Sequence, residues 1–193
     1  MKTKIILSTK FLFAKEAIKN YRTSGTIVPS SKFLASKMLK KINFSSANLI
    51  VELGPGNGAF TKEILKKINS KTTLICFEIN DVFYTELSQI KHPQLKVIKA
   101  SAEFLDIELE KLGFKEIDYI VSSIPLSILP KQLSKIILKQ AHKVLKKTGL
   151  FIQFQYSLLY YQELKNIFLK ENVSLGFEPV NFPPAFVYYC SKN

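Results

Sequence analysis

The segment Ile50-Val51-Glu52-Leu53-Gly54-Pro55-Gly56-Asn57-Gly58 decides which fold this sequence of 193 residues can adopt. An apolar run that contains one acid breaks into three glycines spaced two residues apart, and an apolar pattern with helical spacing follows. Glycine suits such a turn because it adopts positive φ and lets a ligand approach the backbone closely. A strand, a tight turn and a helix start in this order are typical of a nucleotide-cofactor site at the edge of a parallel sheet.

Strands and helices are expected to alternate on both sides of this turn. Apolar runs predict strands at 49–53, 73–77, 96–99, 117–122 and 150–156, with the last strand material at 180–189. Helical spacing predicts helices at 32–41, 60–67, 82–89, 131–146 and 159–170. Such alternation implies right-handed crossovers and an α/β fold with a doubly wound, mostly parallel sheet.

Composition excludes several classes of protein. An apolar content of 47% with seven glycines is typical of a packed globule, and no apolar run reaches the roughly 18 to 20 residues that cross a bilayer. Because no signal-peptide core is present, we expect a cytoplasmic protein. Cys76 and Cys190 do not make a disulfide framework. With His92 and His142 far apart and no clustered thiols, no metal site is expected.

Positive charge is concentrated at the start of the chain. The formal net charge is +13, and residues 1–41 hold nine lysines and Arg22 against Glu16, a local +9 (10 − 1). A basic surface attracts nucleic acid or an anionic membrane. Specific nucleic-acid recognition relies on guanidinium groups, so a single arginine favours the membrane. A preference for lysine codons would also explain the ratio of lysine to arginine, but not the clustering.

Residues 4–21 are expected to form an amphipathic helix. An apolar stripe with 4-3-4-3 spacing is made by Leu7, Phe11, Ala14, Ile18 and Tyr21. Lysines occupy much of the opposite side, a pattern that suits a helix lying in a membrane interface. The same pattern suits an N-terminal helix packed on the core of its own domain, and the sequence leaves both interpretations open.

Two carboxylates help to identify the cofactor, because the glycine spacing alone also fits a dinucleotide such as NAD. Gly58 extends the pattern to G-x-G-x-G, Glu52 places an acid beside the turn, and Glu78 ends the next strand. An acid near the turn can hold the ammonium group of S-adenosylmethionine, and helix N–H groups suit its carboxylate. Glu78 can accept both ribose hydroxyls. These residues favour S-adenosylmethionine, the alternative being surface acids at strand ends.

With these residues, the sequence resembles the class I S-adenosylmethionine-dependent methyltransferases. Residues 51–58 look like the first motif of that superfamily and Phe77-Glu78 like the second. The resemblance implies a Rossmann-like fold whose sheet includes a C-terminal antiparallel strand. It also implies that Ser101 and Ala102 lie where adenine is usually held, with Ser101 in place of an aspartate that is common there.

The segment Ser122-Ser123-Ile124-Pro125-Leu126 follows a strand and is expected to hold the methyl acceptor. Methyl transfer is an in-line displacement that needs a neutral nitrogen lone pair aimed at the methyl group. Many amine methyltransferases have Asn-Pro-Pro-Tyr or Asn-Leu-Pro-Tyr at this place. Here Ser123 replaces the amide, and Leu126 replaces the aromatic residue that would stack on a flipped base. The chain also ends shortly after its last strand, whereas the rRNA adenine dimethyltransferases it otherwise resembles carry an added helical domain. Both points favour an acceptor other than a nucleobase.

Four motifs in order narrow the resemblance to the bacterial phospholipid N-methyltransferase family, over about residues 10–190. They occupy residues 25–31, 122–126, 151–156 and 181–188. Members are peripheral membrane enzymes of phospholipid biosynthesis that methylate phosphatidylethanolamine, often through its mono- and dimethyl forms to phosphatidylcholine, and related members act on ornithine lipids. The resemblance implies that residues 4–21 dock on the inner leaflet, that residues 1–41 cover the active site, and that residues 42–193 form the catalytic core.

The sequence therefore predicts two sets of site residues. For S-adenosylmethionine they are Glu52, Gly54, Gly56, Asn57, Gly58, Glu78, Ile79, Ser101, Ala102, Ser122, Pro29 and Ser30. For the amine they are Ser123, Ile124, Pro125, Tyr21 and Tyr156. The two tyrosines would offer ring faces to a quaternary ammonium product, or equally fill core positions. The remaining alternatives are an rRNA or tRNA adenine methyltransferase and a non-catalytic lipid- or cofactor-binding protein of the same fold.

Overall fold

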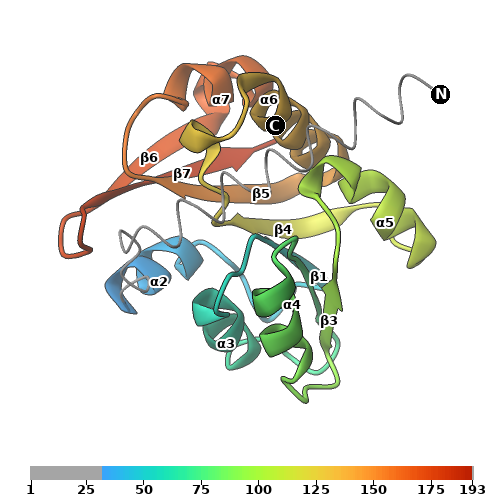
Figure 1. Ribbon diagram of the computed structural model, residues 1–193. Coiled ribbons are helices and arrows are strands. Elements are labelled where there is room, and N and C mark those ends of the chain that lie inside the picture. The colour runs from blue at the N-terminus through green and yellow to red at the C-terminus, as the bar shows by residue number, and fades with distance from the viewer. Residues whose placement is uncertain (1–31, 193) are drawn as a thin grey trace.

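The computed structural model describes residues 32–192, and a seven-stranded sheet runs through them in the order β3-β2-β1-β4-β5-β7-β6 (Figure 1). The strands are β1 (Leu49–Leu53), β2 (Thr73–Phe77), β3 (Leu95–Ile98), β4 (Ile117–Ser122), β5 (Leu145–Gln155), β6 (Val173–Glu178) and β7 (Ala185–Ser191). Strands β1 to β5 pair in parallel, and β7 pairs antiparallel with both β5 and β6. The carboxyl ends of the parallel strands therefore meet at one edge of the sheet.

Helices cover both faces of the sheet (Figure 1). One face carries α2 (Lys32–Leu39), α3 (Ala59–Leu65) and α4 (Asp81–Ser88), and the other carries α5 (Leu105–Lys111), α6 (Lys131–Val144) and α7 (Tyr161–Phe168). Short 3-10 turns lie at η1 (Ala102–Phe104), η2 (Leu126–Ile128) and η3 (Lys170–Asn172). Every residue of β1 is buried, as expected for a central parallel strand covered on both faces.

Each face of the sheet has its own hydrophobic core. Under α6 and α7, Phe151 stacks on Phe168 with ring centroids 5.4 Å apart. Under α2 and α3, Leu34 and Met38 pack with Phe60 in a second cluster. Because α2 is buried against the same sheet as the later helices, residues 32–39 belong to the core of the fold and not to a separate unit.

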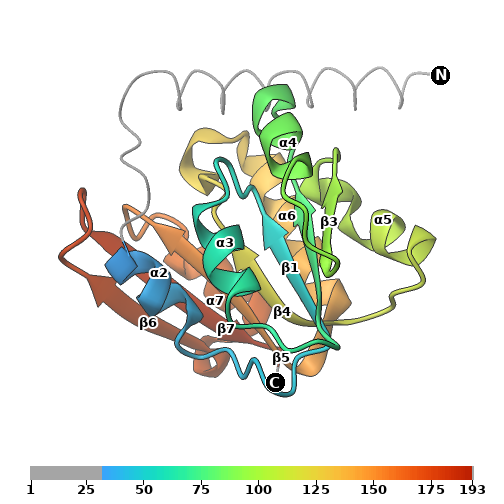
Figure 2. The same cartoon turned by 90° about the horizontal axis from the view of Figure 1, so that it is seen from below.

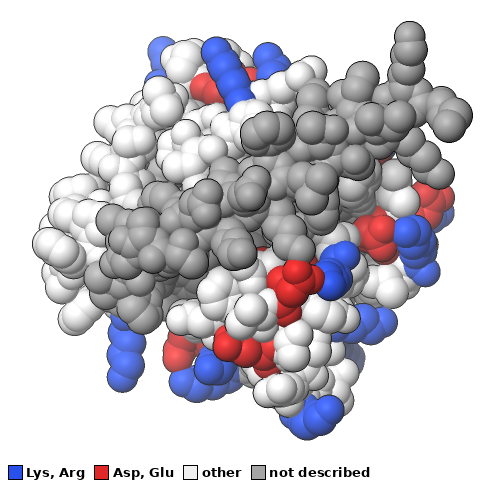
Figure 3. Space-filling model, in the orientation of Figure 1, with Lys and Arg blue, Asp and Glu red and all other residues white. Residues whose placement is uncertain are grey.

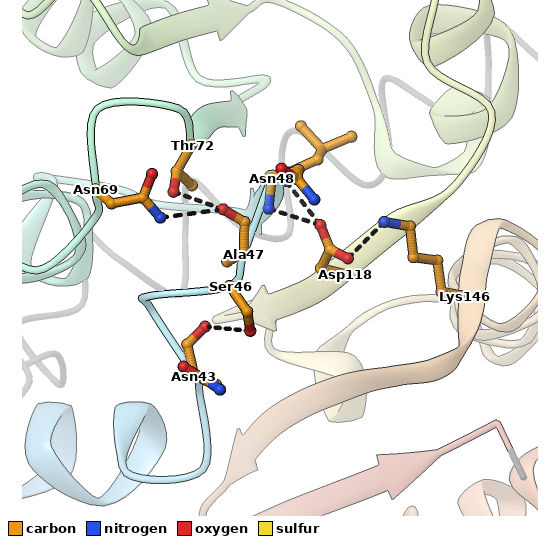
Figure 4. A network of polar contacts seen from close by, with 9 residues as sticks. Asn43, Ser46, Ala47, Asn48, Asn69, Thr72, Asp118 and Lys146 are labelled. Carbon is orange, nitrogen blue, oxygen red and sulfur yellow. Dashed lines mark hydrogen bonds and ion pairs between the residues drawn. The ribbon is translucent and has the colours of Figure 1, made fainter.

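Polar contacts join the strands at the opposite, amino edge of the sheet (Figure 4). Asp118 on β4 accepts hydrogen bonds from the backbone N–H groups of Asn48 and Leu49, both at 2.9 Å. Its other oxygen pairs with Nζ of Lys146 at 2.6 Å. Thr72, just before β2, donates its hydroxyl to the carbonyl of Ala47 at 2.7 Å. These contacts hold β1 in register with both neighbours, so the strand ends at the carboxyl edge are aligned.

The structure confirms the predicted α/β fold with a doubly wound sheet and a C-terminal antiparallel strand. It corrects three details. Helix α5 and strand β6 were not expected, β5 begins at Leu145 rather than 150, and the predicted strand material at 180–189 divides into a turn at 179–184 and β7. The hydrophobic stripe of α5 is short because charged residues interrupt it, and β6 is an edge strand with exposed apolar side chains.

Several predictions lie outside the described residues. These are the helix at 4–21, the cap formed by residues up to 31, and the site residues Tyr21, Pro29 and Ser30. Among residues 32–192, no helix combines the length and the hydropathy that a membrane span requires, and no cluster of histidine, cysteine and acidic side chains could bind a metal ion.

Candidate functional site

The turn after β1 depends on glycine at each of its three glycine positions. Gly54, Gly56 and Gly58 have φ angles of 67°, 59° and 77°, a region that side chains with a Cβ rarely adopt. Space is also limited, because a Cβ on Gly54 would lie 3.1 Å from Cγ1 of Ile124. A Cβ on Gly58 would lie 2.9 Å from Cδ2 of Leu87. The backbone of the turn therefore packs directly against the loop after β4 and against α4.

Glu78 connects the end of β2 to this turn. Its carboxylate is 2% exposed, and Oε2 accepts the N–H of Gly56 at 3.0 Å. Oε1 accepts the N–H of Asn80 at 2.8 Å, and Asn80 in turn caps α4. Each carboxylate oxygen can accept more than one hydrogen bond. Glu78 is thus held rigidly and can still accept ribose hydroxyls.

A cavity opens between the carboxyl ends of β1, β2 and β4, with an empty volume of about 440 Å³ including its mouth. Seven predicted site residues line it: Gly54, Glu78, Ile79, Ser101, Ala102, Ile124 and Pro125. The rest of the lining is mainly apolar, from Phe77, Ala100, Leu129, Leu133 and Ile137. An apolar cavity with a few fixed polar groups is typical of small-molecule sites.

Ser101 has a second role in addition to lining the cavity. Its Oγ accepts the N–H of Glu103 at 3.4 Å and thereby caps η1. A hydroxyl oxygen that accepts one hydrogen bond has a further lone pair and its own proton. The group can therefore still meet the amino group or ring nitrogen of adenine, the role predicted for this position.

Glu52 does not line the cavity but lies beneath the turn, with no exposed surface. Its Oε2 accepts the hydroxyl of Thr61 at 2.6 Å and the thiol of Cys76 at 3.5 Å. Burial raises the pKa of Glu52 to about 7, against the opposing effect of these hydrogen bonds. Its Oε1 has no hydrogen-bond partner among the described residues. The predicted contact between Glu52 and an ammonium group remains a prediction.

Six other predicted residues stand outside the cavity lining: Gly56 and Gly58 of the turn, and Asn57, Ser122, Ser123 and Tyr156. Asn57 accepts the N–H of Ala59 at 3.2 Å and so stabilises the turn. Ser122 is fully buried, and its Oγ accepts the N–H of Ile124 at 3.4 Å. Ser123 is partly buried. Tyr156 is partly buried and packs edge-on against Phe154.

The loop after β4 is tied to both of its neighbours. The N–H of Ser123 donates to the carbonyl of Leu53 at 2.9 Å, which joins this loop to the cofactor turn. The carbonyl of Ile124 accepts two side-chain amides from β5, Nε2 of Gln153 at 3.1 Å and Nε2 of Gln155 at 3.0 Å. Both glutamines are buried. They fix the position of the predicted acceptor loop.

Gln153 and Gln155 were not among the predicted site residues. The signal for them was their spacing, since residues two apart in a strand lie on the same face. Two amides on one face of an otherwise apolar and aromatic strand require polar partners, because buried polar groups are nearly always hydrogen-bonded. Which carbonyl they would meet depends on β5 pairing with β4, and that pairing is a property of the tertiary structure.

The side-chain hydroxyl of Ser123 is a hydrogen-bond acceptor of this loop that is not used within residues 32–192. A carbonyl oxygen has two lone pairs and so accepts two hydrogen bonds. The carbonyl of Ile124 already accepts two, one from each glutamine amide. The Oγ of Ser123 is buried and has no partner among the described residues. The predicted contact between Ser123 and a substrate amine remains a prediction.

The site fits S-adenosylmethionine on two structural grounds. The backbone of Gly54 lines the cavity where a Cβ would intrude, so a ligand can press against it. Glu52 keeps an unpartnered buried oxygen beneath the turn, and Glu78 provides a fixed carboxylate at the cavity wall. A buried carboxyl oxygen and a fixed carboxylate at these positions suit a cofactor that carries an ammonium group, a sulfonium group and a ribose.

Comparison with known proteins gives a family and two kinds of relative. The family described as Ribosomal RNA adenine dimethylase matches residues 27–158. The ornithine lipid N-methyltransferase of Singulisphaera acidiphila is 29% identical over 182 residues, which cover 93% of this chain and 94% of that enzyme. The ribosomal RNA small subunit methyltransferase A of Ureaplasma urealyticum is 32% identical over 143 residues, which cover 64% of this chain and 48% of that enzyme.

Two solved structures that are described as methyltransferases have the same fold. A SAM-dependent methyltransferase from Aquifex aeolicus has a TM-score of 0.59 at 12% identity, covering 81% of this chain and 88% of that one. The precorrin-6y C5,15-methyltransferase of Geobacter metallireducens has a TM-score of 0.64 at 11% identity, covering 88% and 92%. At such identities the likeness concerns the fold alone.

Replacing Gly54 by alanine should weaken the binding of S-adenosylmethionine about tenfold, a cost of roughly 1.4 kcal/mol, because a Cβ disfavours the left-handed backbone and crowds Ile124, so the turn must shift. Isothermal titration calorimetry measures the affinity. Gly113→Ala is the matched control, since Gly113 also has positive φ but a Cβ there meets nothing within 4 Å. The control should lose stability and keep its affinity. Equal affinities of the two variants would contradict this role for the turn.

The pH dependence of stability should reveal Glu52. The folded protein holds the Glu52 proton up to a pKa of about 7, whereas the unfolded chain releases it near 4.5. The free energy of unfolding therefore falls as pH rises through this window. From pH 5 to pH 8, Glu52→Gln should gain about 2 to 3 kcal/mol relative to the wild type, measured by urea denaturation. Parallel pH curves for the two proteins would show that burial does not shift this carboxyl.

Proposed function

Because the chain belongs to the ribosomal RNA adenine dimethylase family and is an S-adenosylmethionine-dependent methyltransferase, we propose that it methylates the amine of a membrane lipid headgroup. S-adenosylmethionine supplies the methyl group, as an electrophile on a sulfonium centre. The protein must bind the acceptor nitrogen, orient its lone pair and exclude water. The residues of the loop after β4 are those placed to do so.

The observation that carries this proposal is the chemistry of that loop. Leu126 has no exposed surface, and its carbonyl accepts the hydroxyl of Ser134 at 3.0 Å. An aliphatic side chain turned into the core offers no surface on which an extruded base could stack, and stacking is how base-modifying enzymes hold their target. A small aliphatic amine needs no such surface.

The extent of similarity to the two kinds of relative supports the same acceptor. The family match ends at residue 158. The alignment with the ornithine lipid enzyme spans 182 residues, so it must continue beyond residue 158. Similarity to the lipid enzyme therefore extends into the part of the chain that forms α7 and β6.

Within the site, Ser123 is the residue proposed to meet the amine. Its buried Oγ can accept an N–H of the neutral amine, which directs the nitrogen lone pair away from the hydroxyl. Tyr156 follows Gln155 directly and is proposed to face the methylated product. The first acceptor to test is phosphatidylethanolamine, with its mono- and dimethyl forms as successive substrates. Ornithine lipid is the second, since that substrate appears in the name of a relative.

Attachment to the membrane forms part of the proposal. The lysine-rich segment 4–21 would dock on anionic lipid at the inner leaflet of the cytoplasmic membrane, where each basic group contributes about 1 kcal/mol at low salt. This segment lies outside the described residues. A peripheral location would let the enzyme take the headgroup without extracting the lipid.

A second candidate function is adenine methylation in rRNA. The family match and the similarity to ribosomal RNA methyltransferases favour it. A third candidate, a non-catalytic binding protein of the same fold, rests on the serines that replace more usual residues at positions 101 and 123.

Labelled S-adenosylmethionine separates these candidates. We expect label in the lipid fraction when vesicles contain phosphatidylethanolamine or ornithine lipid, and none with phosphatidylglycerol alone, which has no amine. Small-subunit rRNA serves as the competing acceptor in a parallel reaction. Labelled RNA with unlabelled lipid would replace the proposal by the second function. Cofactor binding without transfer to either acceptor would replace it by the third.

Loss of the Gln155 amide should impair catalysis more than cofactor binding. Gln155→Met keeps the length of the side chain and removes one donor to the carbonyl of Ile124, a change worth roughly 1 kcal/mol or more. We expect kcat to fall about tenfold while the Kd for S-adenosylmethionine changes less than about twofold. Gln162→Met, on the exposed side of α7, is the control and should match the wild type. An unchanged kcat in Gln155→Met would contradict a positioning role.

A further inference from the structure

The turn between β6 and β7 exposes large apolar side chains. Phe182 is 78% exposed and Val180 is 61% exposed. Phe177, at the end of β6, is 47% exposed and packs on the ring of Phe186. We call residues 177–184 the hairpin tip. Such exposure of neighbouring apolar residues on a folded protein marks an interaction surface.

The hairpin tip lies at the same edge of the sheet as the cofactor cavity. Strand β7 runs antiparallel to β5, so its first residues pair with the last residues of β5, Phe186 with Gln155. Gln155 also donates to the carbonyl of Ile124 in the acceptor loop. One short series of contacts therefore joins the hairpin tip to the acceptor loop. Figures 1 and 2 show the tip projecting at this edge, beyond the rest of the sheet.

Several backbone groups of the tip are either absent or hydrogen-bonded within the tip. Pro179, Pro183 and Pro184 have no N–H. The N–H of Val180 donates to Oε1 of Glu178 at 3.2 Å. Asn181 is 3% exposed, and its amide donates to the carbonyl of Pro183 at 2.8 Å. Lipid penalises unsatisfied backbone groups heavily, so a loop that satisfies or lacks them can enter an interface at low cost.

The tip also lacks free charge. Residues 179–190 include no charged side chain. Glu178, at the base of the tip, is paired with Lys37 at 3.8 Å. Figure 3 shows an uncharged surface over this hairpin, in contrast to the lysines and acids that border the lower helices.

Other exposed apolar residues lie at the same edge, on separate elements. Leu159, in the loop after β5, is 71% exposed, and Val82, in the first turn of α4, is 63% exposed. A stable protein interface buries about 800 Å² of surface on each partner. Apolar side chains spread over several elements at the edge that carries the cavity suit a flat lipid surface better than a single protein partner.

We propose that the hairpin tip inserts Phe182 and Val180 into the interface of a lipid bilayer, as a membrane contact separate from residues 4–21. The proposal rests on the proposed function, because a lipid acceptor enters the cavity from the bilayer. Insertion at this point would turn the carboxyl edge of the sheet toward the membrane and bring the headgroup to the acceptor loop.

Tryptophan fluorescence tests the contact directly, because the chain contains no tryptophan. Phe182→Trp should shift its emission to the blue when vesicles of phosphatidylethanolamine and phosphatidylglycerol are added. Lipids brominated in the acyl chain should quench it. Leu112→Trp is the control, since Leu112 is 37% exposed at the end of α5, toward the amino edge. Its emission should not change.

Two results would overturn the proposal. One is unchanged Phe182→Trp emission under conditions in which the protein sediments with the vesicles. The other is a blue shift that grows with protein concentration in the absence of lipid, together with dimer formation in analytical ultracentrifugation, because the hairpin tip would then be a contact between copies of the chain.

Phe182→Ser adds a functional measurement and separates this proposal from the proposed function. Its affinity for vesicles should fall about tenfold, because a buried aromatic side chain is lost. Its kcat on a short-chain, monomeric phosphatidylethanolamine should stay at the wild-type value. Unchanged affinity for vesicles would count against insertion. If Phe182→Trp inserts but no amine lipid is methylated, the hairpin proposal stands and the acceptor proposal fails.

Discussion

The close contact between the β1 turn and the β4 loop is the constraint on which the rest of the site depends. Gly54 and Ile124 approach so closely that a Cβ would lie 3.1 Å from the isoleucine side chain. The N–H of Ser123 also donates to the carbonyl of Leu53 at 2.9 Å. This contact sets the cofactor turn directly beside the predicted acceptor loop. An in-line transfer requires that proximity, because positioning supplies most of the rate.

Local signals explain which parts of the fold the sequence could predict. A buried central strand followed by glycines of positive φ is encoded within nine residues, so β1 and its turn were found with their bounds. Strand β6 has no such signal, because an edge strand buries few side chains and its stability comes from pairing with β7. The same holds for Gln153 and Gln155, whose partner, the carbonyl of Ile124, is 29 and 31 residues away in the chain.

The two acids that identified the cofactor have separate environments in the structure. Glu78 follows the end of β2 and lines the cavity, whereas Glu52 lies within β1 and faces Thr61 of α3. Spacing in the sequence cannot separate these cases, because the face toward which a strand residue points depends on what covers the sheet. Burial raises the pKa of Glu52 to about 7, so this buried acid takes its proton back near neutral pH. Its charge state then couples the stability of the turn to pH.

The two edges of the sheet differ in chemistry: the amino edge is polar and hydrogen-bonded, and the carboxyl edge exposes apolar side chains. At the amino edge, Asp118 and Lys146 belong to a network that holds the strands in register (Figure 4). The polar contacts that stabilise the sheet therefore lie at the edge opposite the cavity. The carboxyl edge exposes Phe182 and Val180 to water. Exposed apolar side chains lower the solubility of a protein and do not contribute to its hydrophobic core. Side chains that stay in water contribute no hydrophobic free energy to folding. In the proposed membrane contact, a bilayer at this edge would bury the two side chains that folding leaves exposed.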